Sequence, residues 1–306
     1  MLPLPSLALL HQLRLRGTLT AAAEALRLSR SAASHQLASL QRRLGVPLTE
    51  RVGRGLRLTE AGEALAVQAE RVLAEVEHSE AVVERARGEV SGTIGLAAVQ
   101  TAAINVLPKA LTLLGSRYPN LRVECRSLDT EQALVAVPAG EIDIAVVPRY
   151  EATPLRPMEQ LVVTRLFRDP MRLVVPAGHR LATATTPVSI AELAGESWVT
   201  GEPDSYFGRL VPSLCEQVGF TPDIVHRSTD HAVISALVAA GHGVTVLPES
   251  ALPATGSPSL AVLSIAGASI DRDVVALTRR GSARRPTIQA VIDGLRQASR
   301  TDRQPE

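Results

Sequence analysis

The sequence predicts a mixed α/β protein, with a small and mostly helical N-terminal part followed by a larger part of alternating strands and helices. Three observations predict this organisation. Helical periodicity dominates residues 1–58, one uninterrupted helical pattern fills 59–90, and strand patterns alternate with helix patterns over 91–300. At 306 residues the chain is long enough for two or three compact units, and 301–306 reads as a short tail.

The N-terminal part predicts a helix over 5–16 and then two further helices. Gly17 ends the first helix, and Thr20 is placed to cap the second, which runs to Leu26. Ser29 is placed to cap the third. Apolar side chains of the third helix recur at the spacing of a single buried stripe: Ala33, Leu37, Leu40 and Leu44.

The other face of this third helix carries small, polar and basic side chains. They are Arg30, Ser31, Ser34, His35, Ala38 and Arg42. Short side chains let a helix lie deep in the DNA major groove, where polar groups reach the base edges. Two short helices joined by a tight turn, the second with such a face, predict a helix-turn-helix.

A small hairpin follows the third helix in the predicted order. Residues 48–51 and 56–58 read as two strands around the turn Gly53-Arg54-Gly55. The hairpin is typical of a wing and would carry basic side chains toward phosphates or the minor groove: Arg51, Arg54 and Arg57.

Charge is distributed unevenly along the chain. Residues 1–58 contain nine Arg and two Glu, a net charge of +7, whereas 59–90 carry −5 and the whole chain only +1. A basic block indicates a polyanionic partner. The alternative is that 18–44 form a plain helical hairpin with a solvated polar face, and the charge and the wing arginines disfavour it.

A heptad pattern spans residues 58–90, with Thr59 placed to cap the helix. Roughly 30 residues at about 1.5 Å each give a rod of some 45 Å. A second copy of the chain is the favoured partner for this stripe, and packing against the rest of its own chain is the alternative. The stripe consists of Leu58, Gly62, Leu65, Ala69, Val72, Val76, Ser79, Val83, Ala86 and Val90.

The pattern after residue 91 predicts a parallel α/β sheet divided into two lobes. Expected strands are 93–98, 121–127, 142–147, 171–175, 198–200, 223–226, 244–247 and 273–277, and expected helices are 103–117, 130–138, 189–194, 205–218, 231–240 and 286–298. Ligands bind such sheets at the carboxyl ends of strands. The candidate segments are therefore 99–101, 128–130, 147–149, 200–202 and 228–230.

The stretch GTLTAAAEALRLSRSAASHQLASLQRRLGVPLTERVGRGLRLTEAGEAL, residues 17–65, resembles the N-terminal signature of LysR-type transcriptional regulators. The resemblance continues through segments that look like the effector domain of that family. These are LPKALTLLGSRYPNLRVE (107–124), GEIDIAVVP (140–148), DPMRLVVPAGHRLA (169–182), LAGESWV (193–199) and LVAAGHGVTVLPE (237–249).

This resemblance implies a winged helix-turn-helix over 1–58, a dimerising linker helix over 59–90 and an effector domain over 91–300. The effector domain would consist of two Rossmann-like subdomains similar to type 2 periplasmic binding proteins. The chain would cross between the subdomains near residues 162–164 and 264–266. The first subdomain would then comprise 92–162 and 266–300, and the second would comprise 163–265. The resemblance further implies a tetramer, an interrupted inverted repeat in double-stranded DNA, and a small metabolite bound between the subdomains.

The resemblance places the residues that read DNA bases in this family at Arg30, Ser31, Ser34 and His35. Phosphate contacts fall on Thr20, Ser29, Arg42, Arg51 and Arg54. The family commonly has an arginine where His35 stands, so we hypothesise that Arg30 takes over recognition of guanine.

The predicted effector-binding residues are Gln100, Thr101, Leu128, Thr130, Pro148, Thr200, Gly201, Glu202, Thr229 and Asp230. Ligand contact is favoured for Gln100 and Thr101, where backbone N–H groups suit a carboxylate. For Thr200, Thr229 and Asp230, ligand contact and helix capping remain equally open.

Two other classes of protein compete with this one. A cytoplasmic metabolite-binding protein without a direct DNA role fits the second half but not the basic block. An enzyme is not indicated, because no GxSxG, HExxH, P-loop or GxGxxG stands in a strand–helix context. No catalytic residue and no cofactor beyond the small-molecule effector is predicted.

Metal, redox and membrane roles are not predicted either. His226, His231 and His242 lack the spacing of metal ligands on one helix face, so no metal site is expected. Cys125 and Cys215 match no CxxC or metal pattern and are expected to be buried, inert thiols. We find no membrane-spanning or signal segment and expect a cytoplasmic protein.

Overall fold

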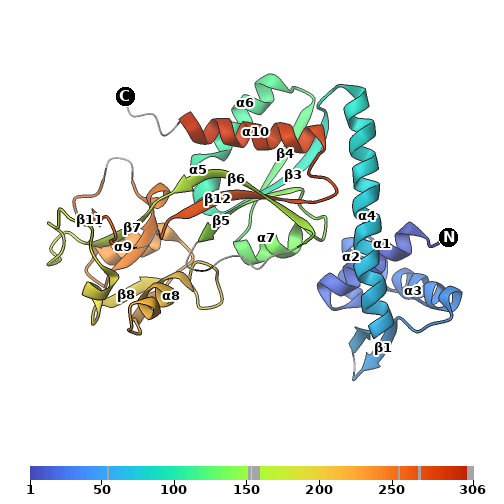
Figure 1. Ribbon diagram of the computed structural model, residues 1–306, viewed down its shortest axis with the longest axis horizontal. Coiled ribbons are helices and arrows are strands. Elements are labelled where there is room, and N and C mark those ends of the chain that lie inside the picture. Colours follow the sequence, from blue (N-terminus) through green and yellow to red (C-terminus); the bar gives the residue numbers. More distant parts are fainter. Residues whose placement is uncertain (54, 151–152, 154–158, 254–255, 268–269, 302–306) are drawn as a thin grey trace.

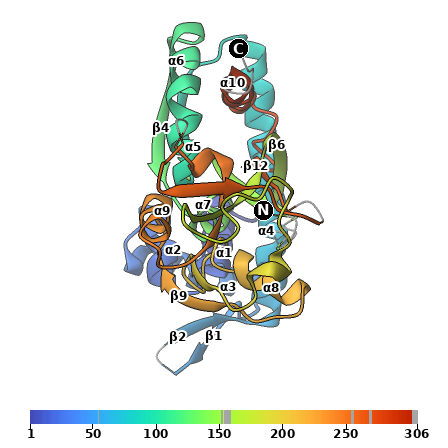
Figure 2. The ribbon, with the colours of Figure 1, turned by 90° about the vertical axis from the view of Figure 1, so that its left-hand side faces the viewer.

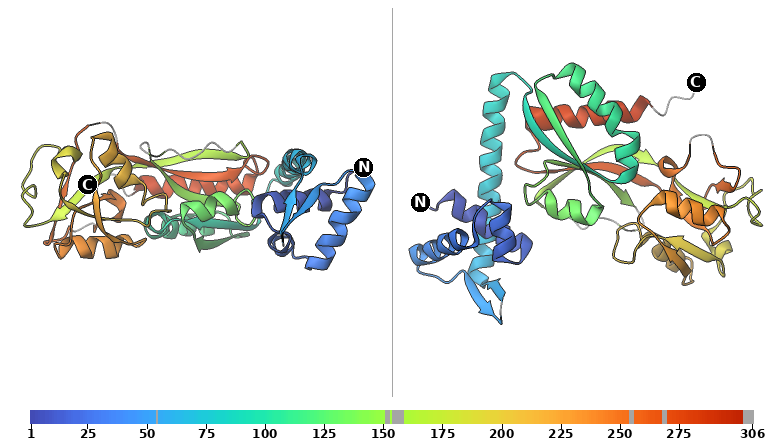
Figure 3. Two further views of the ribbon diagram at one scale, coloured as in Figure 1. Left: turned by 90° about the horizontal axis from the view of Figure 1, so that it is seen from below. Right: turned by 180° about the vertical axis from the view of Figure 1, so that it is seen from behind.

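A computed structural model describes residues 1–53, 55–150, 153, 159–253, 256–267 and 270–301. Arg54 and residues 302–306 of the tail lie outside the described residues. A small N-terminal domain and a long helix stand beside a two-lobed effector domain (Figure 1). Seen from behind, the long helix rises from the N-terminal domain along the first lobe, and the second lobe lies at the far end (Figure 3). Among the described residues no helix combines the length and hydrophobicity needed to cross a membrane.

The N-terminal domain is a winged helix-turn-helix. Its elements are α1 (Leu4–Arg16), α2 (Leu19–Ala25), α3 (Arg30–Leu44), β1 (Thr49–Val52) and β2 (Gly55–Leu58). The three helices enclose a core of small and aliphatic side chains that includes Leu10, Ala22, Ala33, Leu37 and Leu40. Strands β1 and β2 pair antiparallel, and Glu50 lies opposite Arg57.

Two details of this domain differ from expectation. Thr18, not Thr20, caps α2, because its Oγ1 accepts a hydrogen bond of 3.2 Å from the Ala21 N–H. Thr20 therefore lies within the first turn and is exposed. Leu44, expected in the buried stripe, is 37% exposed because it is the last residue of α3 and extends beyond the core.

The linker helix α4 (Glu60–Arg87) begins after the cap Thr59 and ends at Gly88, whose φ of 69° is left-handed. Part of its heptad stripe packs on its own chain rather than on a second copy. Gly62 and Ala69 are buried, and a Cβ on Gly62 would lie 1.9 Å from the Leu48 carbonyl oxygen. From Val72 onward the stripe is largely exposed, with Val83 55% exposed.

The described part of the first lobe contains a sheet of five strands in the order β4-β3-β5-β12-β6. Helices α5, α6 and α10 cover one face and α7 covers the other. The elements are β3 (Gly92–Ala98), α5 (Gln100–Asn105), α6 (Leu107–Arg117), β4 (Leu121–Ser127), α7 (Thr130–Ala136), β5 (Ile144–Tyr150), β6 (Leu161–Asp169), β12 (Arg272–Arg279) and α10 (Pro286–Thr301).

The pairing corrects the expectation of a wholly parallel sheet. Strand β3 pairs parallel with β4 and β5, but β12 runs antiparallel to both β5 and β6. Strand β6 was not predicted from the sequence. Because all of β6 pairs with β12, the chain leaves the first lobe after Asp169, later than the expected crossing near 162–164, and it re-enters the sheet at Arg272.

The second lobe holds the antiparallel sheet β10-β7-β11 and the parallel pair β8-β9. Its core surrounds Trp198. Its elements are β7 (Met171–Pro176), the 3-10 turn η1 (Ile190–Leu193), β8 (Ser197–Thr200), α8 (Leu210–Gln217), β9 (Asp223–Arg227), α9 (His231–Ala239), β10 (Thr245–Pro248), the 3-10 turn η2 (Glu249–Ala251) and β11 (Leu260–Leu263).

Several boundaries in the effector domain differ from prediction. The expected helix 103–117 is two helices, α5 and α6, which meet at Val106. The expected helix 205–218 begins only at Leu210, so that Ser205, Tyr206 and Phe207 lie in a loop that faces the first lobe. Strand β11 was not predicted.

Candidate nucleic-acid interface and ligand cleft

Helix α3 presents a small and polar face to solvent at the outer side of the N-terminal domain. Arg30, Ser31, Ser34 and His35 are all exposed along it. Ser29 caps the helix by accepting a hydrogen bond of 3.2 Å from the Ala32 N–H. The β1–β2 hairpin projects beyond the same domain (Figure 2). This geometry leaves a helix and a wing free to approach one partner.

The basic side chains around α3 divide into free and paired groups. Arg42 and Arg51 are exposed, and no carboxylate in the described part of the chain lies within ion-pair distance of either. Arg57 is not free, because it pairs with Glu50 across the hairpin at 2.6 Å. Thr20 is exposed on α2, and the predicted contact Arg54 lies outside the described residues.

The two lobes of the effector domain enclose a cleft of about 420 Å³. Its walls are the ends of β3, β4 and β5, the loop before α8, the start of α9 and the first residue of β12. The lining residues are Val99, Gln100, Thr101, Ser127, Leu128, Asp129, Thr130, Glu131, Gln132, Pro148, Tyr150, Ser205, Tyr206, Phe207, Thr229, Asp230, His231 and Arg272.

A buried ion pair forms the floor of the cleft. Arg272 is 2% exposed and Asp169 1%, and two guanidinium nitrogens donate to Asp169 Oδ2 at 2.8 and 3.0 Å. The guanidinium also donates to Thr101 Oγ1 at 2.8 Å and to the Tyr150 hydroxyl at 3.3 Å. Burial acts to lower the pKa of Arg272, but Tyr150 and Asp169 outweigh it and the pKa is raised.

Side chains from both lobes meet across the cleft. Gln100 of the first lobe donates to Asp230 Oδ1 of the second at 3.2 Å. Arg209 of the second lobe pairs with Glu131 of the first at 3.0 Å. These contacts join the two lobes across the cavity.

An aromatic wall lies on the second-lobe side. The Tyr206 hydroxyl accepts a hydrogen bond of 3.0 Å from the Tyr150 N–H, and the two rings lie 5.0 Å apart. Burial raises the pKa of Tyr206 to about 12. His231 contacts Phe207 edge-on at 4.9 Å, and burial, with the charge of Arg272, lowers its pKa to about 4. His231 is therefore neutral at pH 7.

Seven of the ten residues proposed from sequence line this cavity. They are Gln100, Thr101, Leu128, Thr130, Pro148, Thr229 and Asp230. Thr200, Gly201 and Glu202 do not line it. They form the base of the loop that carries Tyr206, where the Gly201 carbonyl accepts from Arg227 and the Glu202 carbonyl from Ser205.

Sequence patterns do not predict the ion pair of the floor or the aromatic wall. Arg272, Tyr150 and His231 come from three strand or helix ends that are distant in sequence, and no local motif marks them. Only the candidate segments 147–149 and 228–230 pointed toward these residues. Tyr150 directly follows the first segment, and His231 directly follows the second.

The two cysteines lie in different lobes. Cys215 is fully buried in the second-lobe core, where burial raises its pKa to about 12. Cys125 was expected to be buried but is exposed, because β4 is the edge strand of its sheet. Partial desolvation still raises its pKa.

The histidines singled out in the sequence do not come together as a set of three. His226 and His242 stack edge-on at 5.5 Å, whereas His231 lies in the cleft. In the described ranges no group of three or more His, Cys, Asp or Glu side chains is arranged to hold a metal ion.

A winged helix-turn-helix joined to a two-lobed ligand cleft defines a DNA-binding transcriptional regulator controlled by a small-molecule effector. The chain belongs to the LysR family. Residues 4–63 match the model of the bacterial regulatory helix-turn-helix protein, lysR family, and residues 87–300 match that of the LysR substrate binding domain.

Several characterised transcriptional regulators are similar to this chain in sequence. The Hca operon transcriptional activator HcaR of Escherichia coli is 34% identical over 75% of this chain and 76% of its own length. The regulator CbbR of Rhodospirillum rubrum is 27% identical over 92% of this chain and 91% of its own. The hydrogen peroxide-inducible genes activator of Dickeya chrysanthemi is 28% identical over 76% and 74% respectively.

Solved structures share the fold over the full length. A full-length OxyR variant from Pseudomonas aeruginosa matches with a TM-score of 0.70 and 24% identity, and the match covers 100% of this chain and 99% of that one. Full-length BenM matches with a TM-score of 0.59 and 22% identity over 98% of each chain.

The burial of the two thiols leads to a test of their reactivity. In the folded protein we expect iodoacetamide at pH 8 to label Cys125 and to leave Cys215 unmodified, because a buried thiol with a pKa of about 12 supplies little thiolate. Mass spectrometry of the two peptides measures this, and unfolded protein, in which both should react, is the control. Equal labelling of both thiols in the native state would contradict the assignment of Cys215 to the core.

Proposed function

We propose that α3 and the wing bind an inverted-repeat operator in double-stranded DNA. The exposed small-residue face of α3 carries this proposal. Arg30, Ser31, Ser34 and His35 would face the base edges, because all four are exposed on one face of α3 and combine short side chains with polar and basic ones. Thr20, Ser29, Arg42, Arg51 and Arg54 would contact the backbone. With DNA as its partner, a cytoplasmic location is proposed as well.

The inter-lobe cleft is the proposed effector site. A volume of about 420 Å³ suits a small metabolite. Thr101 and Thr130 lie at the starts of α5 and α7, beside the aromatic wall of Tyr150 and Tyr206. The N-termini of α7 and α9 are already capped by Asp129 and Asp230, so an anionic group of the effector is best accommodated at Gln100 and Thr101.

A second copy of the chain is the proposed partner of α4, and the resemblance further supports a tetramer. Ala74, Glu77, Ala81 and Glu84 face the chain's own effector domain. The exposed positions of the stripe, such as Val72 and Val83, lie on the opposite side of the helix. Apolar positions at heptad spacing on a free face favour a coiled-coil contact.

The names of the OxyR-like relatives raise the alternative of a peroxide response. The thiols of this chain do not support it. Cys215 is sealed in the second-lobe core and Cys125 lies on the far edge of the first-lobe sheet, and burial raises both pKa values. A bound metabolite is therefore favoured over a thiol reaction.

The operator-binding proposal is tested by binding measurements on selected and random DNA. For Arg30→Ala we expect about tenfold or greater loss of affinity for an operator selected from a random pool, and a much smaller loss on random DNA. For Arg42→Ala we expect equal losses on both and a salt slope smaller by about one. Arg117→Ala, at an exposed side chain at the end of α6 in the effector domain, is the control. Equal losses for Arg30→Ala and His35→Ala on both DNAs would make these residues phosphate contacts.

The dimer proposal is tested by sedimentation of full-length variants. Because it introduces a charge into the exposed heptad stripe, we expect Val83→Glu to raise the dimer dissociation constant at least about tenfold. Val82→Glu makes the same substitution one residue away, off the stripe, at a side chain that is 51% exposed, and should have a much smaller effect. A dimer that survives Val83→Glu unchanged would show that α4 is not the contact.

A further inference from the structure

Two elements of the first lobe extend from the ligand cleft to the N-terminal domain and the linker helix. Helix α7 begins in the cleft, where Asp129 and Thr130 line the cavity, and it ends in the turn 137–141. Strand β12 begins in the cleft at Arg272 and ends at Arg279. Both far ends contact residues outside the effector domain.

The turn after α7 rests on α1 of the DNA-binding domain. Gln12 Nε2 donates to the Ala139 carbonyl at 2.7 Å, and Arg16 pairs with Glu141. Gln12 is 6% exposed, so this hydrogen bond is shielded from water. The contact is direct and lies within one chain.

Arg279 joins the same turn to the linker helix. Its Nε donates to Glu77 of α4 at 2.6 Å, and its two terminal nitrogens donate to the Val137 and Ile142 carbonyls at 3.1 and 2.9 Å and to Asp143 at 3.0 Å. One guanidinium therefore links β12, the turn after α7 and α4. Removing it would break all of these links together.

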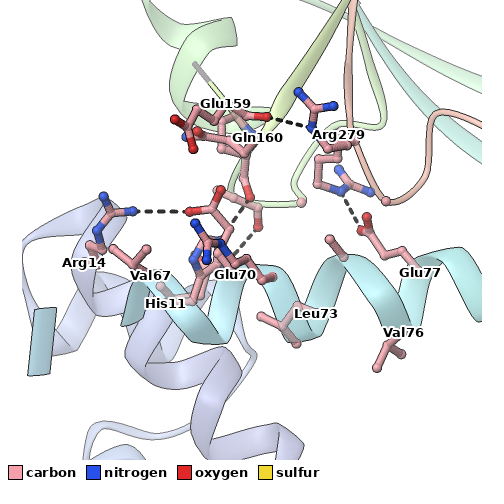
Figure 4. Close-up of a pocket in the computed structure, with 18 of the residues that line it drawn as sticks. His11, Arg14, Val67, Glu70, Leu73, Val76, Glu77, Glu159, Gln160 and Arg279 are labelled. Atoms are coloured by element: carbon pink, nitrogen blue, oxygen red, sulfur yellow. Dashed lines mark hydrogen bonds and ion pairs between the residues drawn. The ribbon is translucent and has the colours of Figure 1, made fainter. Parts of the chain in front are cut away.

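The junction is otherwise loosely filled. A cavity of about 750 Å³ lies between α1, α4 and the first lobe, and Figure 4 shows Arg279 reaching Glu77 at its edge. The loop after β12 approaches α4 closely at Gly281, where a Cβ would lie 2.6 Å from the Ala74 carbonyl oxygen, and Arg285 pairs with Glu84 at 2.8 Å. A few polar contacts around a void allow movement more readily than a packed core does.

We propose that these contacts form an intrachain latch through which the cleft sets the position of the DNA-binding domain. The latch consists of Gln12, Arg16 and Glu77 on one side and Ala139, Glu141 and Arg279 on the other. Helix α7 and β12 connect the latch to the cleft, and the regulatory use of this connection rests on the effector site proposed above. A change at the cleft end of α7 shifts the turn 137–141 and loosens α1.

Two carboxylate caps on opposite walls of the cleft provide a matched test. Asp129 caps α7, which leads to the latch, and Asp230 caps α9, which does not. In full-length protein without ligand, we expect Asp129→Ala to speed amide hydrogen exchange about threefold or more in both 133–143 and 4–16. Asp230→Ala should speed exchange in 231–239 and leave 4–16 unchanged.

Two outcomes would overturn the latch. One is an unchanged exchange rate in 4–16 for Asp129→Ala, and the other is an equal increase for Asp230→Ala. No ligand is used, so a failure here is distinct from a failure of the effector site.

A second pair of variants tests the latch from the linker side. Gly281→Ala places a methyl group against the Ala74 backbone and should speed exchange in 4–16 and 70–84 about threefold or more, with the exchange of β3 and β5 unchanged. Gly178→Ala, where a Cβ meets no atom within 4 Å, is the control. If Gly281→Ala leaves exchange in 4–16 and 70–84 as in the wild type, the junction is not a latch.

Discussion

The effector domain depends on one buried ion pair, Arg272 with Asp169. The two residues lie opposite each other at the ends of antiparallel β12 and β6, where the chain leaves the first lobe and where it returns. Charges removed from water this completely are stable only when they are paired and hydrogen-bonded. Ser250 of the second lobe meets this need, since its hydroxyl donates to Asp169 at 2.6 Å. The pair therefore lies at the junction of the two lobes and joins them.

The same ion pair also shapes the polar character of the cleft. Because Arg272 also donates to Thr101 and Tyr150, it positions the start of α5 and the aromatic wall with the same guanidinium. The nearby positive charge helps to keep His231 neutral. Most polar groups of the floor therefore hydrogen-bond to one another. The groups left for an effector are hydroxyl groups, aromatic rings and the start of α5, which has no side-chain cap.

The features that the sequence predicts best are those encoded in one short, continuous stretch. The small-residue face of α3, its Ser29 cap and the heptad pattern of α4 are each written in one continuous stretch, and the structure has the corresponding elements at those places. The antiparallel placement of β12 is not local, because it joins β5 and β6 to residues more than 100 positions away. For that reason Arg272 was missed although Thr101, to which it donates, was proposed. Cys125 was misjudged for a related reason, since alternation does not reveal that β4 is an edge strand.

A double-mutant cycle on the buried pair tests most directly whether it determines the structure of the effector domain. Asp169→Leu and Arg272→Met each leave one buried charge without its partner, and each should lower the free energy of unfolding by about 3–5 kcal/mol. The double variant removes both charges and should lose clearly less than the sum, with a coupling of at least about 1 kcal/mol in urea unfolding. Single variants that each cost less than about 1 kcal/mol, or losses that add in full, would contradict the account.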